Sequence, residues 1–349
     1  MDLDHSLAED EFTPSRTHLA TAGTGLLPRS AARAVHEAVD ASAAGAPPDM
    51  FADMEAARAS FARLVDVPVA RVATGSSVAT YTGLIASSLP DGAEVLTADG
   101  DFSSLVNPFH TRPGLTVRTV PLERIAEHVT EATALVAVSA VQSADGRRAD
   151  LTAVREAARA HGARTLVDAS QAAGWNTLDA DADDYTVCVG FKWLLCPKGT
   201  AFLVAPEDLG VLPPLLAGWV AGEAPFDSCY GPVTELARSA RRYDESPAML
   251  AWAGARHSLA LLERIGTEAV GAHDVALAER FRERLTLAGH APVPAPGSAI
   301  VSVPGLGERA GALGERGITV SDRAGMLRAS FHLYNTAGDV DRLVDALDG

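Results

Sequence analysis

Residues 189–204, "VGFKWLLCPKGTAFLV", form an apolar run with a lysine, Lys192, inside it. Burying an ammonium group without a partner is costly, so Lys192 must reach solvent, find a partner or be kept neutral for chemistry. The stretch divides into the end of one strand, a turn at "CPKG" and the start of a second strand. Lys198 lies in that turn, where we expect it to be solvated. Lys192 therefore stands just past the end of a buried strand.

Around this stretch, short β-branched runs alternate with segments of helical period. The strands are almost fully apolar, which predicts an α/β fold with a mainly parallel sheet covered by helices on both faces. The expected strands are 92–99, 115–122, 134–141, 164–170, 185–191 and 199–205, and the expected helices are 78–89, 123–130 and 151–162. The last of these helices ends in Gly162, a common C-terminal cap.

The pattern changes after residue 206, where a stretch rich in proline and glycine (207–232) leads into mixed helices and strands. We expect three segments: an N-terminal segment at 1–30, a large α/β domain at 31–245 and a small α+β domain at 246–349. In the small domain the expected helices are 246–266, 269–288, 307–316 and 337–348, and the expected strands are 298–304, 317–322 and 326–334.

The composition argues against several classes of protein. Lysine and arginine number 29 against 45 aspartates and glutamates, and this net charge of −16 argues against a nucleic-acid partner, because phosphate binding needs clustered cations. No apolar run approaches about 18 residues, so we expect no membrane-spanning helix. The acidic N-terminus, "MDLDHSLAEDEF", lacks the apolar core of a signal peptide. Three cysteines without a CxxC pair make the cytoplasm the expected location, and the ten scattered histidines predict no metal site.

Polar residues stand at three places just past the expected carboxyl end of a strand, the edge where open α/β sheets bind ligands. The first group is "TGSSVATYTG" (74–83), where small and hydroxyl residues stand just before a helix. Free N–H groups and the helix dipole make such a turn a site for an anion such as phosphate. The alternative is an ordinary serine N-cap.

The second group is Asp168 with Gln171 three residues later, and the third is Lys192. An acid at the end of an apolar strand needs a cation or N–H groups, although it can also simply cap the next turn. A partly desolvated lysine has a lowered pKa and supplies the free amine that a Schiff base needs. A phosphate cradle, a buried carboxylate and a buried lysine together are what pyridoxal 5′-phosphate requires.

The segment "TLVDASQAAGWNTLDADADDYTVCVGFKWLLCPKGTAFLV" (165–204) closely resembles the signature region of the class V aminotransferase family, which are fold-type I pyridoxal-phosphate enzymes. That group includes cysteine desulfurases, kynureninases and isopenicillin-N-epimerase-like proteins. "HLATAGTGLLP" (18–28) resembles the N-terminal active-site segment of the family. "LRASFHLYNTAGDVDRLVDAL" (327–347) resembles its C-terminal RxSxxxYN segment. The resemblance implies a large cofactor-binding α/β domain followed by a smaller C-terminal domain.

The resemblance also implies roles for individual residues. Lys192 would be the Schiff-base lysine, Asp168 the partner of the pyridinium nitrogen and Gln171 the hydrogen-bond partner of the ring oxygen. Arg328 would anchor the α-carboxylate of an amino-acid substrate, a task suited to a guanidinium. The remaining implied positions are Gly75, Ser76 and Ser77 on the phosphate, Ala22 and Gly23 near the substrate, and Ser246 reaching the phosphate of a neighbouring subunit, which implies a homodimer.

Two positions depart from the family pattern. Phe191 stands before the lysine, where many relatives have histidine. Phe102 is the best candidate for the position where relatives often place a histidine over the cofactor ring. Its ring could stack but could not carry a proton. Lys192 must then be the main acid and base, which fits simple chemistry at the α-proton.

The reaction is less defined than the cofactor. Cysteine desulfurases need a cysteine on a loop of the small domain, and residues 290–328 contain none. We expect an aminotransferase, because transamination needs no further dedicated group. A β-elimination (C–S) lyase and an amino-acid epimerase remain alternatives within the family. A non-catalytic pyridoxal-phosphate-binding regulator is the alternative of a different class, but it would predict loss of the lysine, aspartate and arginine, and all three are present.

Overall fold

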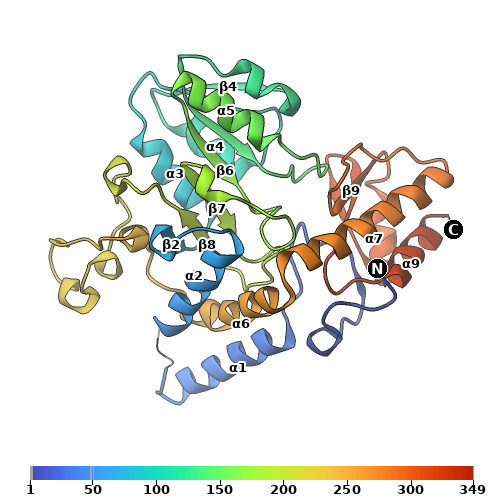
Figure 1. Cartoon of the computed structure of the whole chain (residues 1–349). Helices are drawn as coiled ribbons and strands as arrows, with labels where there is room; N and C mark the ends of the chain where they lie inside the picture. The colour runs from blue at the N-terminus through green and yellow to red at the C-terminus, as the bar shows by residue number, and fades with distance from the viewer. Residues whose placement is uncertain (1–2, 48, 50, 349) are drawn as a thin grey trace.

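The computed structural model describes residues 3–47, 49 and 51–348, and it contains a large α/β unit with a smaller α+β unit beside it (Figure 1). The large unit is built on a seven-stranded sheet in the order β2-β8-β7-β6-β5-β3-β4. Only β8 runs opposite to the other six strands, so the predicted mainly parallel sheet is confirmed. The strands are β2 (Val72–Gly75), β3 (Glu94–Ala98), β4 (Thr116–Val120), β5 (Thr133–Ser139), β6 (Arg164–Asp168), β7 (Tyr185–Val189) and β8 (Ala201–Val204).

Helices cover both faces of this sheet because its strands are apolar on both sides. Successive residues of a strand face opposite ways. Leu166 packs with α3 and α4, whereas Val167 packs in the cluster that contains α2 and α6. The helix α5 lies over the β3–β5 part of the sheet. The helices are α1 (Arg29–Ala43), α2 (Ala52–Leu64), α3 (Val78–Ser88), α4 (Ser103–Thr111), α5 (Leu151–His161) and α6 (Met249–Ile265).

The small unit packs α7 (Thr267–Leu287) and α9 (Ala337–Asp348) on a three-stranded antiparallel sheet. The strands of this sheet are β9 (Ile300–Pro304), β11 (Ser321–Arg323) and β12 (Met326–Ser330), and α8 (Arg309–Glu315) follows β9. The N-terminal segment joins this unit, because β1 (Thr17–His18) pairs in parallel with β10 (Ile318–Thr319). The start and the end of the chain therefore meet on the small unit (Figure 1).

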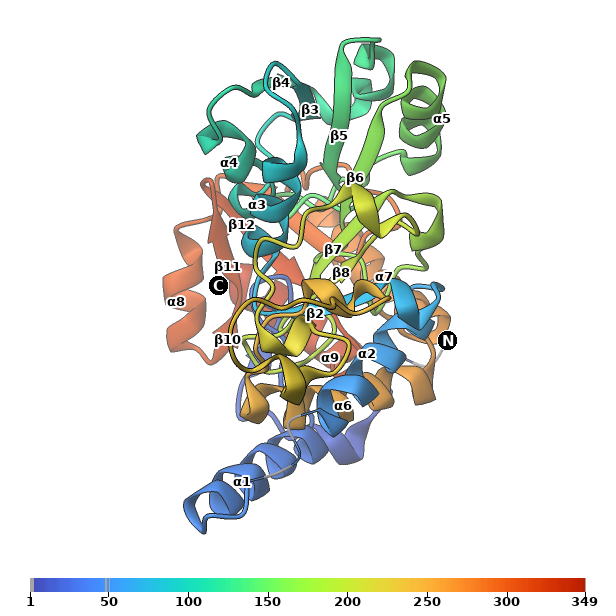
Figure 2. The same cartoon turned by 90° about the vertical axis from the view of Figure 1, so that its left-hand side faces the viewer.

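Between β8 and α6 the chain forms only short 3₁₀ turns, at Leu209–Val211, Trp219–Ala221, Pro225–Ser228 and Ala240–Tyr243. Figure 2 shows this segment, in yellow, in front of β2 and β8. A buried ion pair connects the end of this segment to α2: Arg58 donates to both carboxylate oxygens of Asp244, at 2.6 and 3.0 Å. Burial alone would lower the pKa of Arg58, but Asp244 raises it above its usual value.

Several predicted elements differ from the structure. The helix expected at 123–130 is wrong, since the chain forms two short 3₁₀ turns there, Leu122–Arg124 and Ala126–His128. Eight residues are too few to offset the cost of starting an α-helix without strong tertiary packing. The strand expected at 326–334 ends at Ser330, where the side chain of Asn335 accepts from the His332 N–H and turns the chain. The strand expected at 317–322 is split into β10 and β11, and α1, α2 and α4 were not expected.

We propose the three-part division of the chain as expected, at 1–30, 31–245 and 246–349, with α6 as the connecting helix that packs on α1 and α2. Residues 1–2, 48, 50 and 349 of that division lie outside the described residues. Across the described residues, no helix is both long and apolar enough to cross a membrane.

Candidate active site

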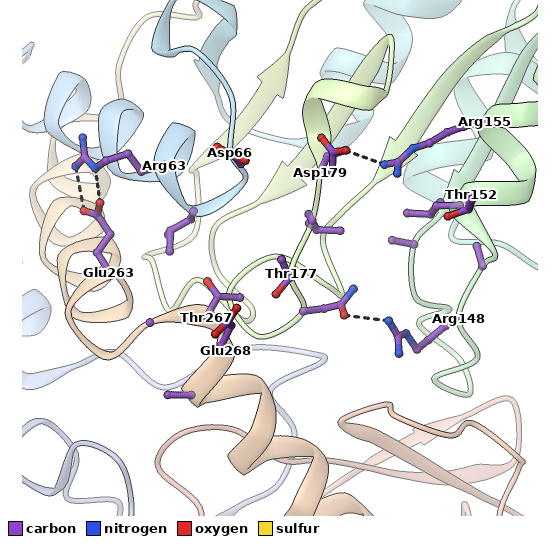
Figure 3. Close-up of a pocket in the computed structure, with 18 of the residues that line it drawn as sticks. Arg63, Asp66, Arg148, Thr152, Arg155, Thr177, Asp179, Glu263, Thr267 and Glu268 are labelled. Atoms are coloured by element: carbon purple, nitrogen blue, oxygen red, sulfur yellow. Dashed lines mark hydrogen bonds and ion pairs between the residues drawn. The ribbon is translucent and has the colours of Figure 1, made fainter. Parts of the chain in front are cut away.

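A wide hollow of about 1070 Å³ lies between the end of α2, the start of α5 and the α6–α7 turn (Figure 3). Its three arginines all have partners, at N···O distances of 2.5–3.1 Å: Arg63 with Glu263, Arg155 with Asp183 and Arg148 with Asn176. None of the predicted site residues lines this hollow. Carboxylates therefore neutralise Arg63 and Arg155, whereas Arg148 is bound only by neutral acceptors among the described residues.

A smaller cavity of about 310 Å³ lies at the carboxyl edge of the seven-stranded sheet. Ser77 follows β2, Asp168 ends β6 and Lys192 follows β7, and these three strands run in the same direction. Their carboxyl ends therefore meet at one edge, as expected for a ligand site in an open α/β sheet. Four more predicted residues line the same cavity: Ala22, Gly23, Phe102 and Arg328.

Lys192 is buried, with 6% of its surface exposed, and its ammonium group forms no hydrogen bond or ion pair with the described residues. Its Nζ atom lies 4.9 Å from the ring centroid of Phe102 and 6.0 Å from that of Phe191. Burial lowers the pKa of Lys192, and the charge of Arg328 lowers it further, against the opposing effect of Asp168. Lys192 is therefore an amine poised to lose its proton and free to bond to a ligand.

Asp168 is buried behind the cavity, where its Oδ1 atom accepts a hydrogen bond of 2.8 Å from the backbone N–H of Ser170. Burial raises the pKa of this carboxyl, although Lys192 and the Ser170 N–H group lower it in part. A buried carboxylate in this state favours a cationic partner within the cavity.

The loop after β2 offers donors for an anion. Ser77 caps α3 by accepting from the backbone N–H of Thr80 at 3.2 Å, and Ser77 and Val78 line the cavity. The first N–H groups of a helix have no partner within the helix, so they are available to a ligand at this end. A Cβ atom on Gly75 would lie 2.6 Å from the hydroxyl of Tyr81, so only glycine fits there.

A carboxylate also lies at this loop. The exposed hydroxyl of Ser76 donates to Oε2 of Glu245 at 2.6 Å, and the other oxygen of Glu245 is buried without a partner. Glu245 is held beside the loop because its backbone N–H donates to Thr74 at 3.1 Å. A phosphate bound here would meet a like charge and would have to displace the Glu245 side chain.

Arg328 lies on β12 with 1% of its surface exposed. Its Nη1 atom donates to the backbone carbonyl and, at 3.1 Å, to the hydroxyl of Ser143, but its Nε and Nη2 atoms are buried without a partner among the described residues. Burial and the nearby Arg323 lower the pKa of Arg328 to about 10. This guanidinium lacks an anion, and a substrate carboxylate would supply one.

Gln171 does not line the cavity. Its amide nitrogen donates to the carbonyl of Ala22 at 2.9 Å and to the hydroxyl of Ser143 at 3.0 Å, and its oxygen accepts from the indole of Trp193 at 2.8 Å. Both amide hydrogens are therefore engaged in the wall behind the cavity. The predicted contact of Gln171 with a ring oxygen stays a prediction. Ser246 is exposed and lies outside the cavity of this single chain, so its predicted contact with a neighbouring subunit's phosphate also stays a prediction.

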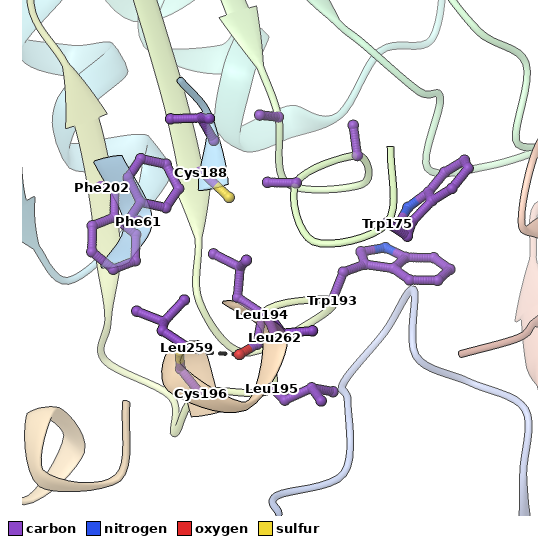
Figure 4. Close-up of a cluster of buried hydrophobic side chains, with 14 of the residues drawn as sticks. Phe61, Trp175, Cys188, Trp193, Leu194, Leu195, Cys196, Phe202, Leu259 and Leu262 are labelled. Atoms are coloured by element: carbon purple, nitrogen blue, oxygen red, sulfur yellow. Dashed lines mark hydrogen bonds between the residues drawn. The ribbon is translucent and has the colours of Figure 1, made fainter. Parts of the chain in front are cut away.

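The backbone on either side of Lys192 is held by close packing. The N–H of Gly25 donates to the carbonyl of Phe191 at 2.9 Å, and a Cβ atom on Gly25 would lie 2.2 Å from the Lys192 carbonyl oxygen. Only glycine permits this approach, which presses the N-terminal segment against the lysine. On the other side, Trp193 is fully buried beside Trp175, with ring centroids 5.5 Å apart (Figure 4).

A buried hydrogen-bonded pair, His332 and Asp274, holds the backbone of Trp193, and the sequence analysis did not predict it. Nε2 of His332 donates to the carbonyl of Trp193 at 3.0 Å, and Nδ1 lies 2.8 Å from a carboxylate oxygen of Asp274 on α7. Both side chains are fully buried. Ser143, Ser170 and Arg323 also line the cavity and were not predicted. Ser143 follows the strand expected at 134–141. Ligands bind at the carboxyl ends of such strands, so the same argument applied to this strand would have predicted Ser143.

The residues of this cavity fit pyridoxal 5′-phosphate. The Lys192 amine without a hydrogen-bond partner suits an aldehyde, the buried Asp168 suits a protonated ring nitrogen, and the N-terminus of α3 suits a phosphate. These three groups face one cavity. The Glu245 carboxylate is the one group at the loop that opposes the phosphate charge.

Comparison with known proteins gives a consistent result. The family model for aminotransferase class-V matches residues 33–343. The chain is 30% identical over 387 residues to isopenicillin N epimerase of Streptomyces clavuligerus, covering 96% of this chain and 95% of that protein. It is 28% identical over 311 residues to the uncharacterized aminotransferase YcbU of Bacillus subtilis (strain 168), covering 84% and 82%. Its fold matches the cystine C–S lyase C-DES, solved with its product cysteine persulfide, with a TM-score of 0.86, 23% identity and 95% and 97% coverage.

Proposed function

The chain belongs to the class V aminotransferase family and is a pyridoxal 5′-phosphate-dependent enzyme of fold type I, and we propose that it is an aminotransferase acting at the α-carbon of an amino acid. The observation that carries the proposal is one cavity lined by an amine without a hydrogen-bond partner, a buried carboxylate and a guanidinium without an ion-pair partner among the described residues. These groups belong to Lys192, Asp168 and Arg328.

Each of the three groups has a separate task. When bound, the cofactor supplies an electron sink for negative charge at the substrate α-carbon. The Asp168 carboxylate would stabilise a positive charge on the ring nitrogen. Arg328 binds the α-carboxylate through Nε and Nη2, the two donors that have no partner in the described chain. Lys192 Nζ accepts the α-proton, since its lowered pKa leaves it a usable base.

The cavity provides one base for moving protons. The rings nearest to Lys192 Nζ belong to Phe102 and Phe191, and neither carries a titratable group. Among the described cavity residues, Lys192 is thus the group suited to accept a proton and return it on the same face. Transamination needs only this, whereas epimerisation by two opposed bases would need a second one. This supports transamination over that form of epimerisation.

The thiols do not suggest a persulfide mechanism. Burial raises the pKa of Cys188 and Cys196, so both stay protonated, and neither lines the cavity. Cys229 is exposed and also lies outside the cavity. The three cysteines are free, as expected in a reducing compartment, and we propose a cytoplasmic location on that ground.

For the cofactor, we propose that Lys192 and Asp168 hold the aldehyde and ring nitrogen, and that Gly75, Ser76 and Ser77 hold the phosphate. Phe102 would lie against the ring, since its side chain is near Lys192 Nζ and lines the cavity. Gln171 would support the ring oxygen from the wall. We also propose that Ala22 and Gly23 border the substrate.

We propose a homodimer for the assembled enzyme. Large apolar side chains are exposed on the segment between β8 and α6: Leu215 at 66%, Phe226 at 71% and Tyr230 at 95%. Burying such a patch against a second copy would remove it from water. Ser246 is exposed nearby in sequence and could then reach the neighbouring cavity. Light scattering on the purified enzyme tests this directly, and a monomer at micromolar concentration would overturn it.

The reaction is tested by incubating the purified holoenzyme with a panel of amino acids and sulfur amino acids plus a keto-acid acceptor. We expect a new keto acid and a new amino acid in equal amounts. Pyruvate with ammonia would instead identify a lyase, and loss of optical rotation without a keto acid would identify an epimerase. Either result would overturn the aminotransferase proposal while leaving the family and the cofactor intact.

A further inference from the structure

A second arginine stands beside Arg328 at the cavity. The register of the β11–β12 hairpin pairs Ser321 with Arg328 and Arg323 with Met326. Residues two apart on a strand share a face, so Arg323 and Arg328 lie on one face as diagonal neighbours, a separation that long side chains span. Both side chains line the same cavity.

The two guanidinium groups converge on one point. A Cβ atom built on Gly23 would lie 3.7 Å from Nη2 of Arg328 and 3.8 Å from Nη2 of Arg323. Because both Nη2 atoms lie within 4 Å of the same point, they are less than about 8 Å from each other. Arg323 is itself close enough to lower the pKa of both Arg328 and Lys192.

Neither guanidinium has a carboxylate within ion-pair distance among the described residues. Arg323 donates through Nη1 only to the backbone carbonyl of Asp322, whose side chain instead accepts from the N–H of Gly325 at 3.1 Å. The chain has 45 acidic residues against 29 basic ones, so acidic side chains are plentiful. Two like charges without a counter-ion at the mouth of a cavity leave room for an anionic ligand with two acidic groups.

We infer that Arg323 determines substrate specificity, and that the substrate is an α-amino acid carrying a second carboxylate on its side chain. Arg328 binds the α-carboxylate and Arg323 binds the side-chain carboxylate. The inference rests on the proposed function, because it assigns Arg328 to the α-carboxylate. It adds the chemical class of the substrate, which neither the family nor the fold decides.

The remaining surroundings of the cavity agree with this arrangement. Near Lys192 the walls are apolar, with Phe102, Phe191, Val78 and Val189. Serine hydroxyls also line the cavity, at Ser77, Ser104, Ser143 and Ser170, but the cationic groups besides Lys192 are the two arginines, so an acidic side chain is attracted to the arginine end. Arg323 is exposed whereas Arg328 is buried, which suits an outer subsite for the side chain and an inner one for the α-carboxylate.

The test uses the holoenzyme and unreactive probes: glutarate and succinate with two carboxylates, and butyrate with one. We expect calorimetry to show at least tenfold tighter binding of the better dicarboxylate than of butyrate. In Arg323→Gln this preference should fall to about twofold or less, and Arg323→Lys should keep part of it. The matched control is Arg316→Gln, an exposed arginine outside the cavity, which should leave the preference unchanged.

Turnover gives an independent readout. The ratio of kcat/KM for glutamate over glutamine, or aspartate over asparagine, should be well above one in the wild type. Arg323→Gln should lower that ratio at least tenfold, mainly through KM. Equal ratios in the wild type and the variant, with active enzyme, would overturn the inference alone. Absence of cofactor absorbance or of any amino-acid turnover would instead overturn the proposed function.

Discussion

Asp274 and His332 lie 2.8 Å apart, fully buried, and through His332 they hold the backbone carbonyl of Trp193, the residue that follows Lys192. The carbonyl can only accept, so Nε2 of His332 carries a hydrogen. Burial raises the pKa of Asp274, and the charge of His332 counteracts this. The pair thus links α7 and the end of β12 in the small unit to the turn that presents the lysine.

Replacing Asp274 with alanine should lower the free energy of unfolding by about 3–5 kcal/mol, because it leaves the His332 imidazole in a fully buried site without its carboxylate. Urea denaturation measures the change. Asp341→Ala is the control: Asp341 is 39% exposed and pairs with Arg280 and Arg284, so its loss should cost about 1 kcal/mol or less. Equal losses in the two variants would contradict a special role for the buried pair.

Replacing Lys192 with alanine should abolish the covalent attachment of cofactor to the protein. Borohydride treatment of the wild type, followed by mass spectrometry, should place the added mass on the peptide that contains Lys192. Lys198→Ala is the matched control, since Lys198 lies in the same turn but is exposed, and it should retain the adduct. An adduct that persists in Lys192→Ala would remove this lysine from the site.

Replacing Arg328 with methionine should raise the stability of the substrate-free protein while weakening the binding of carboxylate ligands. Two of its donors are buried without partners, and an uncompensated buried charge destabilises the folded state. We expect a gain of about 1 kcal/mol or more in the free energy of unfolding. Loss of a charge-assisted contact should weaken carboxylate binding by about 2–5 kcal/mol.

Arg58→Met is the control for the unfolding measurement on Arg328→Met, and the opposite change in stability is expected. Arg58 is as buried as Arg328, but it binds Asp244 through two nitrogens. Its removal should therefore lower the free energy of unfolding by about 3–5 kcal/mol. A loss of stability in both variants would show that Arg328 is satisfied in the folded protein.

The rate at which apoenzyme takes up pyridoxal 5′-phosphate should rise with pH and reach half its maximum below pH 10.5, the usual pKa of a lysine. Burial lowers the pKa of Lys192, so its neutral amine appears at lower pH than on an exposed lysine. Charged Lys192 also destabilises the folded apoenzyme. That penalty is fully present below its folded pKa and is relieved as the pH rises towards 10.5. Stopped-flow absorbance measures the uptake, and a midpoint at or above 10.5 would contradict the lowered pKa.

Replacing Glu245 with glutamine should tighten cofactor binding by up to about tenfold, since a like charge near the phosphate costs about 1 kcal/mol or more. The hydroxyl of Ser76 keeps an acceptor in the glutamine variant, so the loop is preserved. Equilibrium titration of apoenzyme with pyridoxal 5′-phosphate measures the change, with the exposed Glu207→Gln as the control. Unchanged affinity would mean that Glu245 leaves the loop at no cost when the cofactor binds.

Two of the residues that line the candidate cavity were predictable from local sequence pattern. Apolar strands at 164–170 and 185–191 made the sheet predictable, and Asp168 and Lys192 then followed from their places at the strand ends. Arg328 was predicted only through the resemblance to a family, because it is distant in sequence from Asp168 and Lys192 and belongs to the small unit. The wrong helix at 123–130 shows the limit of local pattern, since a short segment takes its form from its surroundings.

The sheet, the residues at the strand ends and the cofactor were predictable from the sequence, because periodicity and strand ends are local properties of the chain. Which distant residues join them at the candidate cavity depends on the tertiary structure. The pairing of Arg323 with Met326 turns two arginines onto one face, and the contact of His332 with Trp193 joins the two units behind Lys192. Such contacts depend on hairpin register and on packing between units, and single-sequence patterns carry no record of either.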